Sequence, residues 1–453
     1  MTWRFDLCID REPQTVDATN IISAALSMNL RPFLFSLGML AGLGNLSGAQ
    51  PSGSPVIFDV RQLGAKGDGK SLDTAPIQKA LDDCGKLGGG IVTFPSGTYL
   101  SKPIFLRSKT TLHLDAGATL LATDDRGDFL RPDKPDATNS SSGFFAFING
   151  KDLTDITIRG KGAIDGSGAK WWVPAGAARR KTPNYTLPRP RMILLDGCKN
   201  VRVEGVTLAN SPSFHLVPQN CEKVRIDNVT ITAPDHSPNT DGIDPSVSRD
   251  VVIANCLIDV GDDNIAIKSG RKIAGCEFAC EDITITNCVF KHGHGLSIGS
   301  ETVGGVRNLT VRNCTFEGTE NGLRIKSPRG RGGLIENLLY SDITMKGMSP
   351  TAITITCYYP RIPETDETEP MTETTPIFRN IRIANVNGTA TEAAGVIIGL
   401  PESMVTNVVL ENVQISAPTG LTIRNAKGIQ LKNVKIDVQQ GEKVIIKNAE
   451  VKE

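Results

Sequence analysis

A short stretch that the chain repeats decides the fold. Residues 251–258 read Val-Val-Ile-Ala-Asn-Cys-Leu-Ile, residues 283–290 read Ile-Thr-Ile-Thr-Asn-Cys-Val-Phe, and residues 309–316 read Leu-Thr-Val-Arg-Asn-Cys-Thr-Phe. In each copy an aliphatic anchor is followed by apolar residues at the second, fifth and seventh positions after it, and by Asn at the fourth. Apolar residues that alternate in this way predict strands with one buried face.

Further copies of the pattern lie on both sides of this stretch. The anchors are Val201, Val224, Val251, Ile283, Leu309, Leu338, Ile381, Val408 and Ile429. Strand-sized units that recur every roughly 20–50 residues are typical of a solenoid, and no helical period lies between them. The sequence therefore predicts an all-β parallel β-helix, in which equivalent positions of successive coils stack about 4.8 Å apart.

Two columns of the repeat carry residues that suit a stacked coil. The fourth position after the anchor holds Gly205, Asn228, Asn255, Asn287, Asn313, Asp342, Asn385, Asn412 and Asn433. Asn and Gly tolerate the left-handed backbone that a corner requires, and stacked Asn side chains are expected to hydrogen-bond along the axis. Cysteines at inward positions are expected to pack as small apolar residues; these are Cys198, Cys221, Cys256, Cys288 and Cys314. Cys276 and Cys280, in a Gly-containing loop, are the better candidates for a disulfide.

The first 49 residues are predicted to lie outside the fold. Arg31, the apolar run 33–43 and the small residues 47–49 form a secretory signal pattern. Met28 lies directly ahead of that run, so we expect it to be the true start. The mature β-helix domain then comprises residues 50–453, and the protein is expected to be secreted or periplasmic. A buried N-terminal helix is the alternative interpretation of this segment.

Composition restricts the partners. The 453-residue chain carries 49 Lys and Arg against 49 Asp and Glu, and this balance argues against a protein that coats nucleic acid or an anionic membrane. The sequence contains no run of 18 apolar residues, so no membrane span is predicted. Gly at 45 residues and aromatics at 5% favour tight turns and small strands over bulky helical cores. Residues 74–81 predict one short helix, with Asp73 or Thr74 at its N-cap, which would cover the open end of the solenoid.

Four segments interrupt the repeat with charged or glycine residues. They read Asn-Thr-Asp-Gly at 239–242, Gly-Asp-Asp-Asn at 261–264, Gly-His-Gly at 293–295 and Arg-Ile-Lys at 324–326. Each follows a different copy of the repeat, so stacking is expected to bring them together. Glycoside hydrolysis needs one carboxylic acid to protonate the leaving oxygen and a carboxylate to activate water. The two cations alternate along a strand and suit a substrate with its own carboxylate. The alternative is that the Asp-Gly and Asp-Asp pairs only form turns.

In this order the four motifs resemble those of glycoside hydrolase family 28, the polygalacturonases. The stretch 293–300 is the most specific part, and the resemblance covers about residues 56–435. The family's fold is a single-stranded right-handed parallel β-helix of the pectin-lyase type. The resemblance implies a secreted polygalacturonase that hydrolyses α-1,4-galacturonosidic bonds of pectin with inversion.

The resemblance also implies residue roles. Asp262 is the expected general acid, Asp241 and Asp263 are expected to activate the water, and His294 is expected to support the protonation of the acid. The substrate-binding residues that it implies are Arg324, Lys326, Tyr359, Asn239, His215 and Gln219. Tyr358 competes with Tyr359 for the family's tyrosine, and Tyr359 is favoured. No metal and no cofactor are expected.

Rival functions remain open at this stage. Within the family, the enzyme could cut rhamnogalacturonan or xylogalacturonan. A pectate lyase on the same fold would need calcium and a base for a carbon-bound proton, and a non-enzymatic β-helix would bind carbohydrate without product. In each case the partner is a polysaccharide, with no nucleic acid and, after signal removal, no membrane, and a monomer is expected. Endo and exo action are both open.

Overall fold

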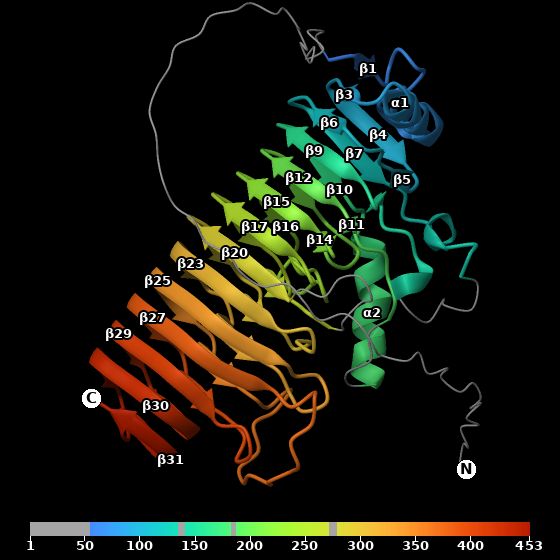
Figure 1. Ribbon diagram of the computed structural model, residues 1–453. Coiled ribbons are helices and arrows are strands. Elements are labelled where there is room, and N and C mark those ends of the chain that lie inside the picture. The colour runs from blue at the N-terminus through green and yellow to red at the C-terminus, as the bar shows by residue number, and fades with distance from the viewer. Residues whose placement is uncertain (1–54, 135–140, 183–186, 271–278) are drawn as a thin grey trace, which may run out of the picture. The chain divides into compact units, whose positions relative to one another are not determined.

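Parallel strands stacked coil upon coil form the body of the protein (Figure 1). The computed structural model describes residues 55–134, 141–182, 187–270 and 279–453. Residues 54–453 form one compact unit, and its strand ladders are parallel. The predicted parallel β-helix is confirmed. The predicted leader at residues 1–49 lies outside the described residues and stays a prediction.

Successive strands contribute to three faces, named A, B and C in the order in which the chain visits them. Face A consists of β1 (Ile57–Asp59), β3 (Gly90–Phe94), β6 (Thr110–Leu114), β9 (Thr154–Gly160), β12 (Lys199–Glu204), β15 (Glu222–Asp227), β17 (Arg249–Ala254) and β20 (Cys280–Thr286). Face B consists of β2 (Asp68–Leu72), β4 (Gly97–Ser101), β7 (Ala118–Ala122), β10 (Ala163–Asp165), β13 (Thr207–Ala209), β16 (Thr230–Thr232), β18 (Leu257–Asp259) and β21 (Val289–Lys291). Four longer strands run from face A onto face B: β23 (Val306–Glu317), β25 (Leu334–Met348), β27 (Ile377–Ala390) and β29 (Val405–Ala417).

Face C carries the strands that matter most for the site. It consists of β5 (Ile104–Phe105), β8 (Ile148–Lys151), β11 (Ile193–Asp196), β14 (Leu216–Gln219), β19 (Ile265–Ile267), β22 (Leu296–Ile298), β24 (Asn321–Lys326), β26 (Thr351–Thr356) and β28 (Ala393–Ile398). The last coils are formed by β30 (Thr419–Val438), which begins on face C and continues around the coil, and by β31 (Val444–Lys452), which pairs with it.

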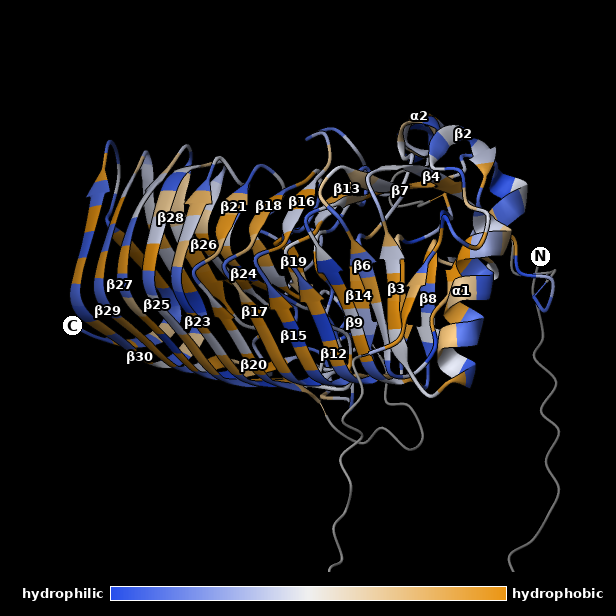
Figure 2. Ribbon diagram, turned by 90° about the horizontal axis from the view of Figure 1, so that it is seen from above, coloured by the Kyte–Doolittle hydropathy of each residue, from blue (hydrophilic) through white to orange (hydrophobic). Residues whose placement is uncertain are grey.

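The register of face A follows the sequence repeat. Val201 pairs with Val224, and Val224 pairs with Val251. The same alignment continues through Ile283 and Leu309. Figure 2 shows the result as alternating hydrophobic and hydrophilic bands along the strands. The alternation therefore places one set of side chains in the core of every coil.

The corner between faces A and B is built from the predicted Asn column. Asn255, Asn287 and Asn313 have positive φ angles of 55°, 56° and 53°. The Asn287 Nδ2 donates to Asn255 Oδ1 at 3.1 Å, and the Asn313 Nδ2 donates to Asn287 Oδ1 at 2.7 Å. The expected ladder along the axis is confirmed, and it fixes the stacking of successive coils.

The cysteines of the described residues are free thiols in the core. The predicted core positions, Cys198, Cys221, Cys256, Cys288 and Cys314, are all buried. The disulfide prediction is wrong for Cys280, which is a free and fully buried thiol. It lies at the start of β20 and pairs in register with Val306, so it occupies a core position like the others. Its suggested partner, Cys276, lies outside the described residues.

Two α-helices flank the coils. α1 (Thr74–Lys86) has Asp73 at its N-cap, buries Ile77 and Leu81 and packs on the first coils, as the predicted end cap requires (Figure 2). α2 (Ala169–Lys181) is inserted between β10 and β11. Short 3-10 turns occur at Arg126–Phe129 and Ser141–Gly143. Among the described residues, no helix is both long and apolar enough to cross a membrane.

Candidate active site

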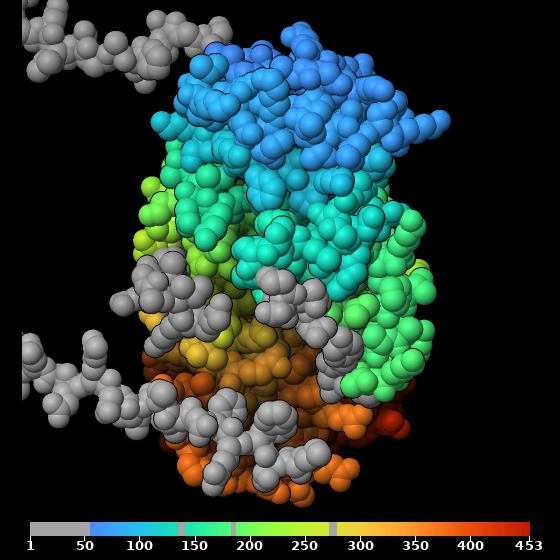
Figure 3. All heavy atoms as spheres, turned by 90° about the vertical axis from the view of Figure 1, so that its right-hand side faces the viewer, coloured from blue at the N-terminus to red at the C-terminus, as the bar shows by residue number. Residues whose placement is uncertain are grey.

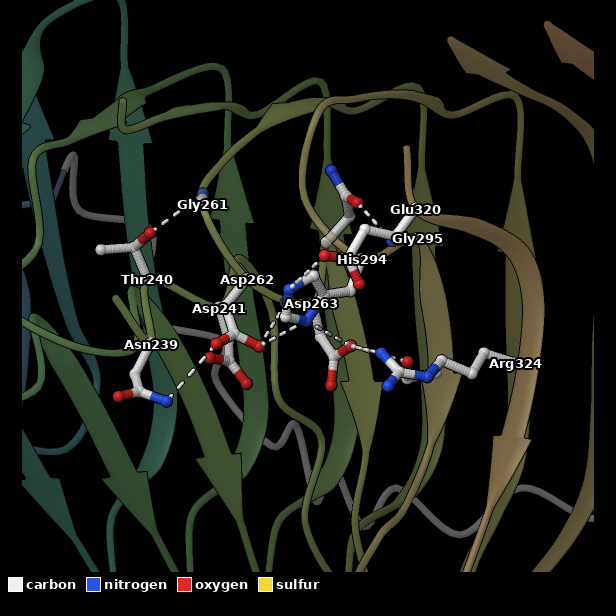
Figure 4. Close-up of polar contacts among 12 residues, drawn as sticks. Asn239, Thr240, Asp241, Gly261, Asp262, Asp263, His294, Gly295, Glu320 and Arg324 are labelled. Carbon is white, nitrogen blue, oxygen red and sulfur yellow. Dashed lines mark hydrogen bonds and ion pairs between the residues drawn. The ribbon is translucent and has the colours of Figure 1, made fainter. Parts of the chain in front are cut away.

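The turns that lead from face B to face C carry the predicted acids and histidine. Asp241 lies two residues before Ile243, which pairs with the first residue of β19. Asp262 and Asp263 lie just before β19, separated from it by Asn264, and His294 precedes β22 in the next coil. Because these turns occupy the same place in successive coils, their side chains meet on one side of the solenoid (Figure 4).

Glycines allow these turns to stack closely. Gly293 and Gly295 have φ angles of 66° and 86°, in the left-handed region. A Cβ at Gly295 would lie 1.9 Å from the Asn321 carbonyl oxygen of the following coil, and a Cβ at Gly293 would lie 2.3 Å from that of Asp262. Only glycine fits both requirements. The Gly-His-Gly sequence therefore holds His294 against the preceding coil.

His294 lies between two carboxylates. Its Nδ1 is 3.0 Å from Asp262 Oδ1, and its Nε2 is 3.3 Å from Glu320 Oε1 (Figure 4). The Asn239 Nδ2 donates to the other oxygen of Asp262 at 3.4 Å. Sequence reasoning missed Glu320, which lies immediately before β24. The available signal was its position in the sequence, four residues before Arg324 of the Arg-Ile-Lys motif.

Asp263 is held by hydrogen bonds and ion pairs from the following coils. The Ser297 Oγ donates to Asp263 Oδ1 at 2.7 Å, and the Lys326 Nζ donates to Oδ2 at 3.1 Å. The Arg324 Nη1 lies 3.5 Å from Oδ1. These contacts bring the Arg-Ile-Lys motif to the acids, as predicted. Ser297 was missed, although it stands in register between Ala266 and Arg324.

Asp241 shares a lysine with a second buried carboxylate. The Lys268 Nζ lies 3.1 Å from Asp241 Oδ2 and 2.8 Å from Asp244 Oδ2. Sequence reasoning missed both Lys268 and Asp244. The signal was the order of residues after the Asp pair: Lys268 follows Ile267 just as Lys326 follows Ile325, which lies in the same register two coils further along the stack.

Burial has the largest effect on the pKa values of Asp241 and Asp244. Burial raises the pKa of Asp241 well above its ordinary range, and the nearby carboxylates add to that effect while Lys268 opposes it. Burial likewise raises the pKa of Asp244 to about 6, again against Lys268. Asp241, Asp244 and Lys268 therefore favour a state in which one of the two acids stays protonated near neutral pH.

Positive charge dominates at the other two acids. Burial tends to raise the pKa of Asp262, but the charge and hydrogen bond of His294 outweigh it and hold that pKa far below its usual value. The pKa of Asp263 is also lowered, because Lys326 and Arg324 outweigh burial. For His294, burial is outweighed by Asp262 and the other carboxylates, so its pKa is raised. The Asp262–His294 pair thus holds one proton, which resides on the imidazole in the ligand-free protein.

Some of these groups line a cavity of about 470 Å³, whereas Arg324, Glu320, Ser297 and Asp244 are not part of its lining. Besides Asp241, Asp262, Asp263, His294, Lys268 and Lys326, its walls include Asn239, Tyr359, Phe214, Arg179, Ser300, Glu301 and Arg331. Tyr359 lies in the wall with the Lys326 Nζ 5.4 Å from its ring centre, whereas the Tyr358 hydroxyl donates to Asp366 at 2.6 Å. The cavity therefore holds the tyrosine that the sequence analysis favoured.

The two least specific sequence predictions have different outcomes. Gln219 lines an adjoining cavity of about 290 Å³, which shares Phe214, Lys268 and Glu301 with the first. His215 does not line either cavity, and the prediction that it contacts substrate has to be corrected. Its side chain is fully buried, with Nδ1 3.0 Å from the Asp241 carbonyl oxygen. His215 thus supports the backbone beneath Asp241.

Comparisons with known proteins identify the family of the chain. The model of the family "Glycosyl hydrolases family 28" matches residues 84–440. The chain belongs to this family. It is therefore a glycoside hydrolase, and its family is that of the polygalacturonases.

Relatives within the family include both modes of action. The chain is 37% identical over 303 residues to an endo-polygalacturonase of Pectobacterium carotovorum, covering 64% of this chain and 73% of that protein. A solved exopolygalacturonase from Thermotoga maritima is 27% identical with a TM-score of 0.66, covering 85% of this chain and 93% of that one. A solved polygalacturonase from Erwinia carotovora is 27% identical with a TM-score of 0.63, covering 90% and 100%. The family hydrolase thus resembles endo-acting and exo-acting enzymes alike.

Proposed function

We propose that this family 28 hydrolase cleaves α-1,4-galacturonosidic bonds of polygalacturonate outside the cell, with inversion at the anomeric carbon. The observation that carries the proposal is a cavity in which three aspartates, two of them buried, meet two lysines and His294. Carboxylates supply acid and base, and the lysines suit a sugar that bears its own carboxylate. The relatives named as polygalacturonases support the same substrate.

The leaving oxygen receives its proton from Asp262. In the ligand-free site that proton resides on His294, 3.0 Å away, partly because Lys326 stabilises the ionised Asp262. A galacturonate carboxylate at Lys326 would offset this charge and raise the pKa of Asp262, so that the proton moves from the imidazole to the carboxyl group. Arg324 adds positive charge beside Lys326, with its Nη1 3.5 Å from Asp263 Oδ1. Binding of the substrate carboxylate thus leaves Asp262 protonated and ready to act as the acid.

The water attacks the anomeric carbon from the opposite side of the sugar. Asp263 is ionised and takes the proton from this water, while Asp241, which lines the same cavity, helps to orient it. As the new carbon–oxygen bond forms, the glycosidic bond breaks and its oxygen takes the proton of Asp262. A single displacement of this kind inverts the configuration.

A time course on polygalacturonate with chelator present tests the proposal. We expect new reducing ends without the absorbance of unsaturated sugars, and anomeric NMR signals of the opposite configuration in the first product. Unsaturated ends would indicate a lyase, and cleavage confined to rhamnogalacturonan or xylogalacturonan would indicate the rival specificities. Monomer as the sole product indicates exo action, and mixed oligomers indicate endo action. Either result leaves the proposed bond chemistry intact.

A further inference from the structure

The α2 helix is inserted at the same kind of turn that carries the catalytic residues. It joins face B to face C, between β10 and β11, and the turns holding Asp241 and Asp262 follow in later coils. The space-filling view shows the atoms of α2, in green, along one side of the molecular face (Figure 3). An insertion at this place in the stack lies beside the catalytic cavity without interrupting the solenoid.

A groove of about 820 Å³ separates α2 from these later turns. One wall is the face of α2 that bears Trp172, Val173 and Arg180, and the opposite wall includes His236 and Pro238. Arg179 lines both this groove and the catalytic cavity, so the two spaces adjoin. A substrate chain that passes through the catalytic cavity has a continuous path along α2.

The groove combines an apolar surface with unpaired positive charge. Val173 is 74% exposed and lies on the groove wall beside Trp172. Arg179 and Arg180 are exposed, and neither forms an ion pair with any residue in the described part of the chain. On the opposite wall, the carboxylate of Asp235 is already 3.2 Å from His236 Nδ1.

A helix-stabilising role explains these cations only in part. Arg179, Arg180 and Lys181 form the last turn of α2, where positive charge favours the helix dipole. Lys181 does not line the groove, whereas Arg180 does. The Arg180 Nη1 lies 3.6 Å from the position that a Cβ of Gly176 would take, so the guanidinium lies back along the groove wall. Its direction is suited to a ligand in the groove and is not required by the helix end.

We propose that the α2 groove binds galacturonate units of the polymer that lie beyond the cleaved bond. Arg180 pairs with a uronate carboxylate, and the exposed Val173 packs against the apolar face of a sugar ring. This inference rests on the proposed function. It predicts that the enzyme prefers long anionic chains to the shortest oligomer that it cleaves.

A charge reversal with a matched control tests this inference. Arg180→Glu and Lys181→Glu change the same charge on the same helical turn, but only the first faces the groove. For each, kcat/KM is measured on polygalacturonate and on the shortest cleaved oligogalacturonide. We expect Arg180→Glu to lower the ratio of the two values by about threefold or more, the size of an exposed ion pair, and we expect this loss to shrink at high salt. Lys181→Glu should leave the ratio unchanged.

The outcomes separate this inference from the function on which it rests. If the parent enzyme cleaves polygalacturonate and Arg180→Glu gives the parental ratio, the groove does not bind substrate. An equal fall of the ratio in both variants would indicate only long-range electrostatics and would also overturn the inference. A parent enzyme that does not cleave polygalacturonate would refute the proposed function, and the α2 inference with it. Thermal unfolding of both variants confirms that the fold is retained.

Discussion

Ser297→Ala is the most specific test of how Asp263 is held. Ser297 is fully buried in β22, and its Oγ donates to Asp263 Oδ1 at 2.7 Å. The substitution removes this donor and changes little else, because the methyl group of alanine occupies the space of the serine Cβ. Asp263 keeps Lys326 at 3.1 Å and Arg324 at 3.5 Å. The carboxylate therefore stays in the site but loses one of the groups that orient it.

The size of the effect follows from the kind of hydrogen bond that is lost. A hydrogen bond to a charged group contributes about 1.5–3 kcal/mol, which corresponds to about a 10- to 150-fold change in rate. Because both cations remain, we expect the lower end, about a tenfold fall in kcat/KM. Loss of the donor also raises the pKa of Asp263. Since the proposed mechanism needs this acid ionised, the acidic limb of the pH–rate profile should move to higher pH.

Ser269→Ala is the matched control. Ser269 is also fully buried and lies on the preceding coil, but its Oγ has no hydrogen-bond partner in the described structure. We expect it to keep parental activity and an unshifted pH profile. Steady-state kinetics on polygalacturonate between about pH 3 and 8 would measure both, a window that brackets the ordinary pKa values of carboxylates and histidine. Parental kinetics in Ser297→Ala, or equal losses in the two variants, would refute this account of Asp263.

Four further changes have defined outcomes. Asp262→Asn should lose most turnover while the melting temperature stays near that of the parent, because the amide has the same shape but no acidic proton; near-parental activity would reject Asp262 as the acid. Glu320→Gln should move the alkaline limb of the pH–rate profile to lower pH, because it removes one of the carboxylates that favour protonated His294; an unmoved limb contradicts this role. Lys268→Met should lower the free energy of unfolding at pH 7 by about 3–5 kcal/mol, since it leaves the ionised carboxylate of the Asp241–Asp244 pair without its cation, and denaturant titrations should show a smaller loss below pH 6, where Asp244 also becomes protonated. Asn287→Ala should cost about 1–2 kcal/mol of stability for its left-handed backbone, and Asn287→Gly should recover most of it; equal losses would mean that the ladder hydrogen bonds dominate.

The repeat could be predicted because the residue type at each position is determined by a local physical requirement. An inward position such as Val251 must be apolar, whatever lies elsewhere in the chain. A corner position such as Asn287 needs a residue that tolerates positive φ, and the observed angle is 56°. Such requirements recur in every coil, so the sequence shows them as columns. The charged motifs were predictable for the same reason, because they break columns that are otherwise regular.

Residues that act through neighbours in other coils were harder to predict. Lys268 has the same place after its strand as Lys326, but its role depends on two carboxylates contributed by the previous coil. His215 was misassigned because its position near the acids was inferred without knowing the direction of its side chain. The structure directs it into the backbone beneath Asp241. Stacking determines which residues meet, but side-chain direction depends on turn geometry that the pattern does not encode.

Structural and catalytic demands are met at different corners of the coil. The corner from face A to face B has nearly the same backbone in each coil, with Asn255 and Asn287 joined at 3.1 Å. The backbone pairing of the parallel strands sets how far apart successive coils stand, and the Asn side chains hydrogen-bond across that spacing. The turn from face B to face C is free to vary, from the few residues around Asp262 to the whole of α2. Because the paired strands set the spacing, acids placed on the second corner of successive coils are brought together. A substitution in the Asn ladder should therefore disturb activity only through stability, whereas a substitution at the opposite corner should alter catalysis in a folded enzyme.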